Sequence, residues 1–261
     1  MSGAVDDLAK GLAEDGALKL WSVLVTCLGD VSQKENVEVS GLVLSTLVER
    51  IGLQPQAMRV ALHRLKRDGW ITSRRDGRVG FHCLSDVGLA QTRAVTMRVY
   101  GPPLEAGPSH LVGLPPDTPD ALSVLPAGMA AVPISRSFAL VTGPIDNLPD
   151  DWMVATPAPR PFPGWVQDVL KEAACEVEFA ALSERLAGVA LPDTPLDRFA
   201  MRVLVLHAWR RLILRSNPAA EMALGQARAE VACRAQVLAV LRDLGPLRTD
   251  RAFATNQSVL P

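Results

Sequence analysis

The stretch "SGLVLSTLVERIGLQPQAMRVALHRLKRDGWITSRRDGRVGFHCL" (residues 40–84) contains the strongest structural signals in the chain. Ser40 is a suitable N-cap for a helix that ends at Gly52. Pro55 suits the first turn of a second helix, which ends at Gly69. The two helices are joined by a tight turn that contains glycine, which is typical of a helix-turn-helix.

The sequence after the second helix predicts a β-hairpin. Asp76-Gly77 lies between two β-competent segments, "WITSRR" and "RVGFHCL", and Asp-Gly is a strong hairpin signal. Ser85 can then cap a helix over residues 85–100. An apolar helix expected over residues 18–28 precedes the whole stretch. This order of elements predicts a winged helix-turn-helix domain.

The helix that begins at Pro55 separates into two faces when its residues are placed about 100° apart. The face predicted to be buried carries Met58, Ala61, Leu62 and Leu65. The outer face carries Gln56, Arg59, Val60, His63 and Arg67, flanked by Arg64 and Lys66. No acidic side chain interrupts the outer face.

Positive charge is concentrated in this helix and the hairpin. The chain has a net charge of −1, yet residues 59–78 contain seven Arg or Lys and only two Asp. Phosphate neutralisation needs such a cluster, and Arg and Gln can pair with base edges in a major groove. The charge run alone would suit an ordinary solvated face; the order of the elements favours DNA binding. The predicted DNA-binding residues are Gln56, Arg59, Val60, His63, Arg64, Arg67, Arg74, Arg75, Arg78 and His82.

Composition and motifs exclude several other classes. Hydrophobic residues make up 48% of the 261 residues and charged residues 21%, as in ordinary globular proteins. The apolar run 20–29 is too short to cross a membrane, the acidic start differs from a signal peptide, and the four cysteines lack metal-type spacing. No nucleophile elbow, P-loop or dinucleotide fingerprint is present. We therefore expect a cytoplasmic protein with no catalytic residue, no metal and no cofactor.

We expect an α+β protein built from consecutive regions that differ in composition and in expected secondary structure. The expected order is an N-terminal tail (1–16), a winged-helix domain (17–98), a small middle α/β domain rich in proline and glycine (99–165), a C-terminal helical domain (166–245) and a tail (246–261).

The predicted helix 196–215 is apolar nearly all round, which indicates burial. Arg210 lies on its central apolar stripe, with His207 and Arg211 beside it. A buried arginine needs an anionic partner. Either the acidic helix 168–184 or the phosphate or thioester-linked acyl group of a ligand could supply one. His207, Arg210 and Arg211 are thus candidate effector-binding residues.

The basic helix and hairpin closely resemble the N-terminal domain of the phenylacetic acid degradation operon repressor (PaaX) family. The pattern is R-x-A-L-x-R-L-x-x-D-G-W, then S-R-R-x-G-R-x-x-F/Y-x-L-[ST]-x-x-G. It is carried by Arg59, Ala61, Leu62, Arg64, Leu65, Asp68, Gly69, Trp70, Ser73, Arg74, Arg75, Gly77, Arg78, Phe81, Leu84, Ser85 and Gly88. A second match, "FAMRVLVLHAWRRLILRSN" (199–217), resembles the family's F-x-x-R-x-x-x-x-H-x-[WY]-R-R-x-x-L-R helix.

The resemblance implies a homodimeric repressor that leaves a double-stranded DNA operator when it binds an aryl-coenzyme A thioester, phenylacetyl-CoA in the best-known case. It also implies a ferredoxin-like middle domain, whose strands "HLVGL" (110–114), "ISRSFALVTG" (134–143) and "DWMVATP" (151–157) could supply. The helix expected between the first two is short and broken by Pro119 and Pro126.

Other functions compete with this interpretation. The first candidate strand of the middle domain has no carboxylate, which argues against a metal-dependent nuclease. A non-specific nucleic-acid or RNA-associated scaffold would bind unrelated duplexes equally. An enzyme acting on an acyl-CoA would turn it over. We expect a transcriptional regulator of aromatic-acid catabolism.

Overall fold

The computed structural model describes residues 3–115, 122, 125, 128–156 and 161–247. The chain forms two compact units, each discontinuous in sequence. The first comprises Met1–Gly101, Arg185–Arg211 and Gln236–Pro261, and the second comprises Pro102–Glu184 and Leu212–Ala235. The units therefore combine segments that the sequence suggests as separate consecutive domains.

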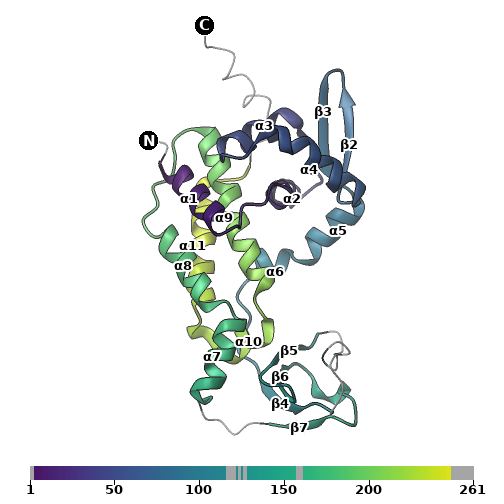
Figure 1. The fold of residues 1–261 in the computed structure, drawn as a ribbon, viewed down its shortest axis with the longest axis vertical. Coiled ribbons are helices and arrows are strands. Elements are labelled where there is room, and N and C mark those ends of the chain that lie inside the picture. The colour runs from purple at the N-terminus through teal and green to yellow at the C-terminus, as the bar shows by residue number, and fades with distance from the viewer. Residues whose placement is uncertain (1–2, 116–121, 123–124, 126–127, 157–160, 248–261) are drawn as a thin grey trace. The chain divides into compact units, whose positions relative to one another are not determined.

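The first unit contains a run of short helices and a small sheet (Figure 1). Its N-terminal elements are α1 (Gly3–Glu14), α2 (Leu20–Val31), β1 (Val39–Ser40), α3 (Gly41–Arg50), α4 (Pro55–Arg67), β2 (Ile71–Asp76), β3 (Val79–Leu84), α5 (Asp86–Ala94) and α6 (Thr96–Tyr100). The three strands are antiparallel in the order β1-β3-β2. The predicted hairpin is confirmed, and it projects from the helices of this unit (Figure 1).

Most of the predicted boundaries in this region are confirmed because they depend on local chemistry. The Ser40 hydroxyl accepts a hydrogen bond from the backbone N–H of Val43 at 3.2 Å, and Pro55 occupies the first turn of α4. Gly52 and Gly69 follow α3 and α4 with φ of +76° and +75°, a conformation that favours glycine. The helix expected over 85–100 is instead two helices, α5 and α6.

The expectation of an N-terminal tail is wrong for the residues that form α1. This helix buries Val5, Leu8 and Leu12, so apolar packing orders it. Its Asp6 accepts a hydrogen bond from Arg50 at the end of α3, at 2.7 Å. At the other end of the chain, the expected tail lies outside the described residues from position 248 onward.

A buried ionic network joins four helices of the first unit. Asp30, at the end of α2, accepts two hydrogen bonds from Arg202 of α9 (Pro195–Arg215), at 2.6 and 2.9 Å, and one from the Tyr100 hydroxyl at 2.8 Å. Arg202 also donates to the backbone carbonyls of Leu241 and Gly245 at the end of α11 (Ala229–Leu244). Burial and the negative charge of Asp30 raise the pKa of Tyr100. The network stays fully hydrogen-bonded, as buried charges require.

The second unit is built on four antiparallel strands. They are β4 (Ser109–Gly113), β5 (Ala130–Pro133), β6 (Phe138–Thr142) and β7 (Met153–Ala155), in the order β5-β6-β4-β7. Each predicted strand segment overlaps a strand, but β5 was not predicted, because "AAVP" is short and ends in proline. The broken helix expected between the first two strands lies almost entirely outside the described residues.

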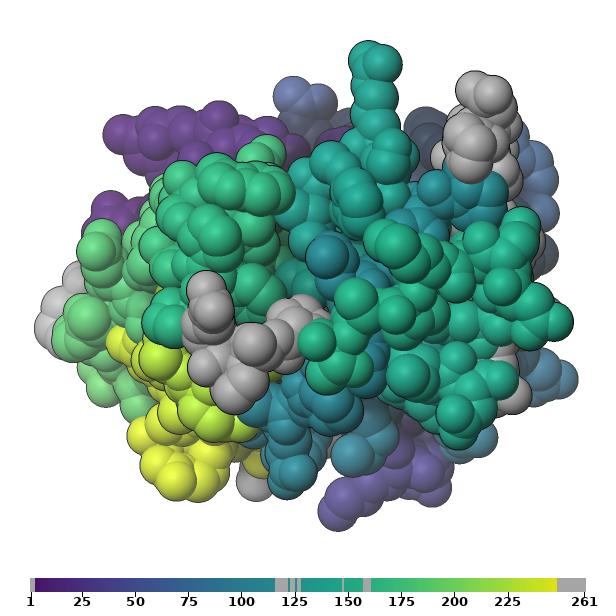
Figure 2. Space-filling model, turned by 90° about the horizontal axis from the view of Figure 1, so that it is seen from below, coloured from purple at the N-terminus to yellow at the C-terminus, as the bar shows by residue number. Residues whose placement is uncertain are grey.

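Helices cover one face of this sheet. These helices are α7 (Gly164–Ala173) and α10 (Pro218–Leu224). The unit also contains α8 (Glu176–Leu186, within this unit up to Glu184) and the short 3-10 helices η2 (Ile145–Asn147) and η3 (Gly225–Ala227). The contacting core contains Val132, Leu140, Val166, Leu170, Ala174, Ala219 and Ala220. A second cluster packs around Val112, Ala139, Val141 and Trp152. In the space-filling view of Figure 2, the sheet region of this unit is teal and the helices that follow it are green.

The C-terminal part of the chain is helical, as the sequence predicts. Helix α9 buries nearly every residue from Phe199 to Trp209, and the Trp209 indole donates to the Val99 carbonyl at 2.9 Å. Within the described ranges, no helix is both long and apolar enough to cross a membrane.

Candidate nucleic-acid interface

Helix α4 is amphipathic in the way that its sequence predicts. Leu62 and Leu65 are buried, Met58 and Ala61 are half-buried, and α4 packs against α2 and α3. The side chains of the opposite face are exposed. These are Gln56, Arg59, Val60, His63, Arg64, Lys66 and Arg67. Packing of the apolar stripe therefore fixes which side of the helix faces solvent.

The exposed polar side chains of α4 differ in their partners. Arg64 and Arg67 lie 3.5 and 3.1 Å from the carboxylate of Asp68, the residue that follows the helix. Arg59 and His63 make no hydrogen bond or ion pair with any residue that the structure describes. Val60, between them, is 72% exposed, which is unusual for a β-branched apolar side chain. These three side chains are free to contact another molecule.

Arg74 of the hairpin is held inside the first unit. Glu38, just before β1, accepts hydrogen bonds from Arg74 Nε through both carboxylate oxygens, at 2.7 and 2.8 Å. The Arg74 guanidinium also lies 4.6 Å from the centre of the Phe81 ring. These bonds lower the pKa of Glu38 and raise the pKa of Arg74. Arg74 is therefore less available to a phosphate than the sequence suggests.

Arg75 and Arg78 belong to the outer part of the same hairpin, on either side of its turn. Arg75 is in register with Gly80, and both arginines are exposed. Neither has a hydrogen-bond or ion-pair partner within the described part of the chain. They are thus the hairpin cations best suited to phosphate contact.

His82 is more enclosed than the other predicted DNA-binding residues. It is half-buried in the central strand of the small sheet, and its Nδ1 lies 2.8 Å from the Ser73 hydroxyl. Burial, with a smaller contribution from Lys66, lowers its pKa. The side chain supports the hairpin, which is a structural role that its position in a predicted strand could not reveal.

His207 is bonded within the first unit. Its Nε2 lies 3.0 Å from the Ala17 carbonyl and its Nδ1 lies 3.3 Å from the Thr26 hydroxyl. Burial lowers its pKa to about 4, so the ring is neutral at pH 7 and Nε2–H donates to Ala17. Both nitrogens therefore already have protein partners.

Arg210 and Arg211 lie on the same helix without an ion pair to any residue that the structure describes. Arg210 lines a small cavity of about 20 Å³ together with Thr26, Asp30 and Tyr100. Burial lowers its pKa. Two other arginines of α9 do pair with carboxylates: Arg202 with Asp30, and Arg215 with Glu178 of the acidic helix α8, both at 2.6 Å. The residues that line this small cavity do not include His207 or Arg211.

The described residues form no metal centre. Among them, no group of three or more His, Cys, Asp or Glu side chains is arranged to hold a metal ion. The four cysteines, all of which lie within the described ranges, form no disulfide.

Comparison with known proteins adds two regional matches. The family described as "PaaX-like protein" matches residues 19–88, and the "PaaX-like, ferredoxin-like domain" matches residues 110–153. These ranges cover α2 to the start of α5, and β4 to the start of β7. Both regions are thus similar to domains of PaaX-like proteins.

Individual proteins are similar to this chain over shorter segments or at lower identity. The transcriptional repressor PaaX of Escherichia coli (strain K12) is 34% identical over 79 residues, 30% of this chain. The matched segment spans 25% of that repressor's length. The solved structure of an uncharacterized protein from Mycobacterium tuberculosis is 17% identical, with 85% of this chain and 97% of that chain covered and a TM-score of 0.40.

The structure explains one glycine of the PaaX-like motif. A Cβ added at Gly88, in the first turn of α5, would lie 2.2 Å from the Trp70 carbonyl oxygen. Ser85 fixes the same junction, because its hydroxyl donates to the Gly69 carbonyl and accepts from the Gly88 N–H. Gly88 thus allows α5 to pass close to the start of the hairpin.

The residue that sequence reasoning missed is Glu38. Its only local signal is an acidic side chain before a short strand, and its partner Arg74 is 36 residues away. Nothing in the spacing identifies this pair.

Proposed function

We propose that this PaaX-like protein is a DNA-binding transcriptional regulator and that its N-terminal region works as a winged helix-turn-helix. The observation that carries the proposal is the set of exposed side chains, unpartnered within the described residues, formed by Arg59 and His63 on α4 and Arg75 and Arg78 on the adjoining hairpin. Surfaces that bind a duplex need cations such as these three arginines to neutralise phosphate.

In this proposal the two parts of the surface have different roles. Helix α4 enters the major groove, where Arg59 and Gln56 are able to pair with the edges of guanine and adenine. Arg75 and Arg78 contact the flanking backbone and so set affinity more than sequence preference. Arg74 contributes to phosphate binding only after its hydrogen bonds with Glu38 break.

The family supports a more specific proposal. We propose that the protein acts in the cytoplasm as a homodimeric repressor of phenylacetate or related aromatic-acid catabolism. A two-fold symmetric protein would present two copies of α4 to a pseudo-palindromic operator. An aryl-CoA ligand such as phenylacetyl-CoA would relieve repression. His207 has little free hydrogen-bonding capacity for such a ligand, which leaves Arg210 and Arg211 as the side chains to test.

Selection of bound fragments from random duplex DNA tests the proposal, followed by affinity measurements on the enriched sequence and on a shuffled duplex of the same composition. A sequence-specific regulator should bind the enriched duplex at least about a thousandfold more tightly at physiological salt. Equal affinity for both duplexes would instead identify a non-specific scaffold.

The enzyme alternative has a separate test. The purified protein is incubated with phenylacetyl-CoA, and the release of free thiol is followed. A regulator leaves the thioester intact, whereas protein-dependent consumption would show an acyl-CoA-acting enzyme.

A further inference from the structure

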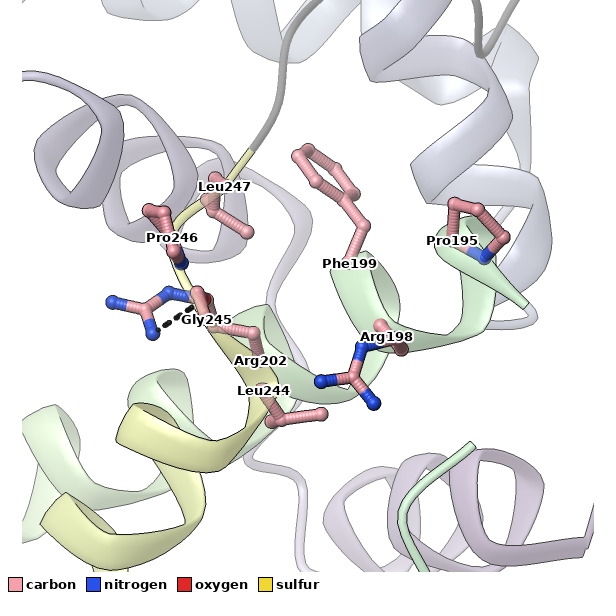
Figure 3. Close-up of a pocket in the computed structure, with 8 residues that line it drawn as sticks. All are labelled: Pro195, Arg198, Phe199, Arg202, Leu244, Gly245, Pro246 and Leu247. Atoms are coloured by element: carbon pink, nitrogen blue, oxygen red, sulfur yellow. Dashed lines mark hydrogen bonds between the residues drawn. The ribbon is translucent and has the colours of Figure 1, made fainter. Parts of the chain in front are cut away.

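A cavity of about 350 Å³ lies between the start of α9 and the end of α11 in the first unit (Figure 3). This volume is at the lower end of the range for small-molecule sites. The lining residues are Pro195, Arg198, Phe199, Arg202, Leu244, Gly245, Pro246 and Leu247. Among these described residues none carries a carboxylate, and the two charged side chains, Arg198 and Arg202, are both positive.

Arg198 has spare capacity for an anion. Its guanidinium donates to the backbone carbonyls of Pro192, at 3.3 Å, and of Asp243, at 2.5 Å. No carboxylate forms an ion pair with it among the residues that the structure describes. Figure 3 shows the guanidinium extending into the space between α9 and the end of α11. Two carbonyls thus orient a positive charge without neutralising it, and a guanidinium has five N–H donors.

The second arginine of the cavity is already satisfied. Arg202 is engaged by Asp30 and by the Leu241 and Gly245 carbonyls, and its guanidinium is turned toward Gly245 (Figure 3). Among the described lining residues, the cavity therefore offers one unneutralised charge, that of Arg198. A single positive charge is matched better by a monoanion than by a phosphate or a dicarboxylate, which carry more negative charge.

The other walls are apolar. The Phe199 and Leu244 side chains are buried, and Leu247 and Pro195 complete the lining. A ligand would gain affinity by placing an apolar body against these side chains. Its acidic group would accept hydrogen bonds from Arg198.

We propose that this cavity binds a small organic monocarboxylate with an apolar body. The carboxylate lies against Arg198, and the body lies between Phe199, Leu244 and Leu247. The site does not include His207, Arg210 or Arg211, and it is independent of the proposed DNA surface. Binding can therefore be measured without DNA.

Isothermal titration of the full chain with benzoate and hexanoate tests the site, with benzamide and acetate as matched probes. Benzoate and hexanoate should bind at least about tenfold more tightly than either control, because benzamide lacks the charge and acetate lacks the apolar body. Equal binding of benzoate and benzamide would overturn the proposal, as would the absence of binding by both apolar carboxylates at millimolar concentration.

Variants locate the binding. Arg198→Gln should weaken benzoate binding about tenfold or more. Arg198→Lys should weaken it less, because lysine keeps the positive charge but cannot donate two parallel hydrogen bonds to a carboxylate as a guanidinium can. Arg242→Gln is the matched control: this arginine lies on α11, is exposed and does not line the cavity. Benzoate affinity should not change in that variant, and equal losses in the Arg198 and Arg242 variants would refute the assignment.

A further variant separates loss of binding from loss of folding. Leu247→Glu places a carboxylate at the partly exposed edge of the cavity and should abolish benzoate binding while the melting temperature stays close to that of the parent protein. If a folded Leu247→Glu variant binds benzoate normally, the ligand lies elsewhere and the proposal fails.

Discussion

Asp30 and Arg202, separated by 172 residues in sequence, form a buried two-point ion pair between the end of α2 and the middle of α9. Their side chains are 2% and 13% exposed. Helix α2 packs against α4, and α9 contributes much of the core. The pair therefore links the helix that supports the proposed DNA surface to the C-terminal half of the same unit.

Asp30→Asn should lower the free energy of unfolding by about 3–5 kcal/mol, because it leaves the Arg202 charge buried and unpaired. Urea unfolding followed by circular dichroism measures the change. Asp243→Asn is the control, since its exposed pair with Arg242 should contribute less than about 1 kcal/mol. A loss no greater than that of the control would contradict the importance of the pair.

Arg59→Ala and His63→Ala should each weaken binding to a selected duplex by about 1–3 kcal/mol if the side chains contact bases. Fluorescence anisotropy at fixed salt gives the affinities. Lys10→Ala is the control: it removes one exposed charge from α1, which lies across the first unit from the hairpin (Figure 1). Unchanged affinity in both α4 variants would refute the proposed recognition face.

Arg75→Ala should instead weaken binding to the selected and shuffled duplexes by the same factor and reduce the salt slope by about 1. The slope of log K against log salt measures this change. A loss confined to the selected duplex would show that Arg75 contacts bases rather than phosphate.

Glu38→Gln should strengthen DNA binding by about threefold and steepen the salt slope by about 1, because it releases Arg74 for a phosphate contact. The companion variant Arg74→Ala should remove the gain when combined with Glu38→Gln. If Glu38→Gln weakens binding, the pair serves to hold the hairpin in its binding position, and Glu38 does not compete with phosphate for Arg74.

The pH dependence of stability should report on His207. The unfolded chain protonates this ring near its ordinary pKa of 6.5, whereas the folded protein protonates it only near a pKa of about 4. The unfolded state thus binds more protons between these values, and the free energy of unfolding should fall as the pH drops, by roughly 3 kcal/mol. Urea unfolding at pH 7, 5.5 and 4.5 measures the slope. His207→Gln should show a shallower slope; an unaltered slope would exclude His207 as its source.

The sequence predicts the helix ends and the hairpin of the first unit because their causes are local. Ser40, Pro55, Gly69 and Asp76-Gly77 each act on neighbouring backbone. The exposed face of α4 follows from the same logic, since four apolar residues at helical spacing determine its buried side. The outward-facing residues of α4 can therefore be predicted from helical periodicity alone.

Features that depend on distant residues cannot be predicted in this way. Glu38 restrains Arg74, and Asp30 neutralises Arg202, but nothing in the spacing of either pair indicates contact. The stability of α1 likewise depends on its packing rather than on a strong local signal. The cavity at Arg198 arises from two helix ends about 45 residues apart in sequence.

The exposed methyl groups of Val60 give the proposed recognition face a chemical preference of its own. An isopropyl group in a major groove can contact the C5-methyl of thymine, which uracil lacks. A-form RNA, moreover, has a major groove too narrow for such a side chain. A surface that places Val60 beside Arg59 and His63 is thus suited to thymine-containing duplexes. Replacing a contacted thymine by deoxyuridine would remove one methyl group from the interface without changing any charge.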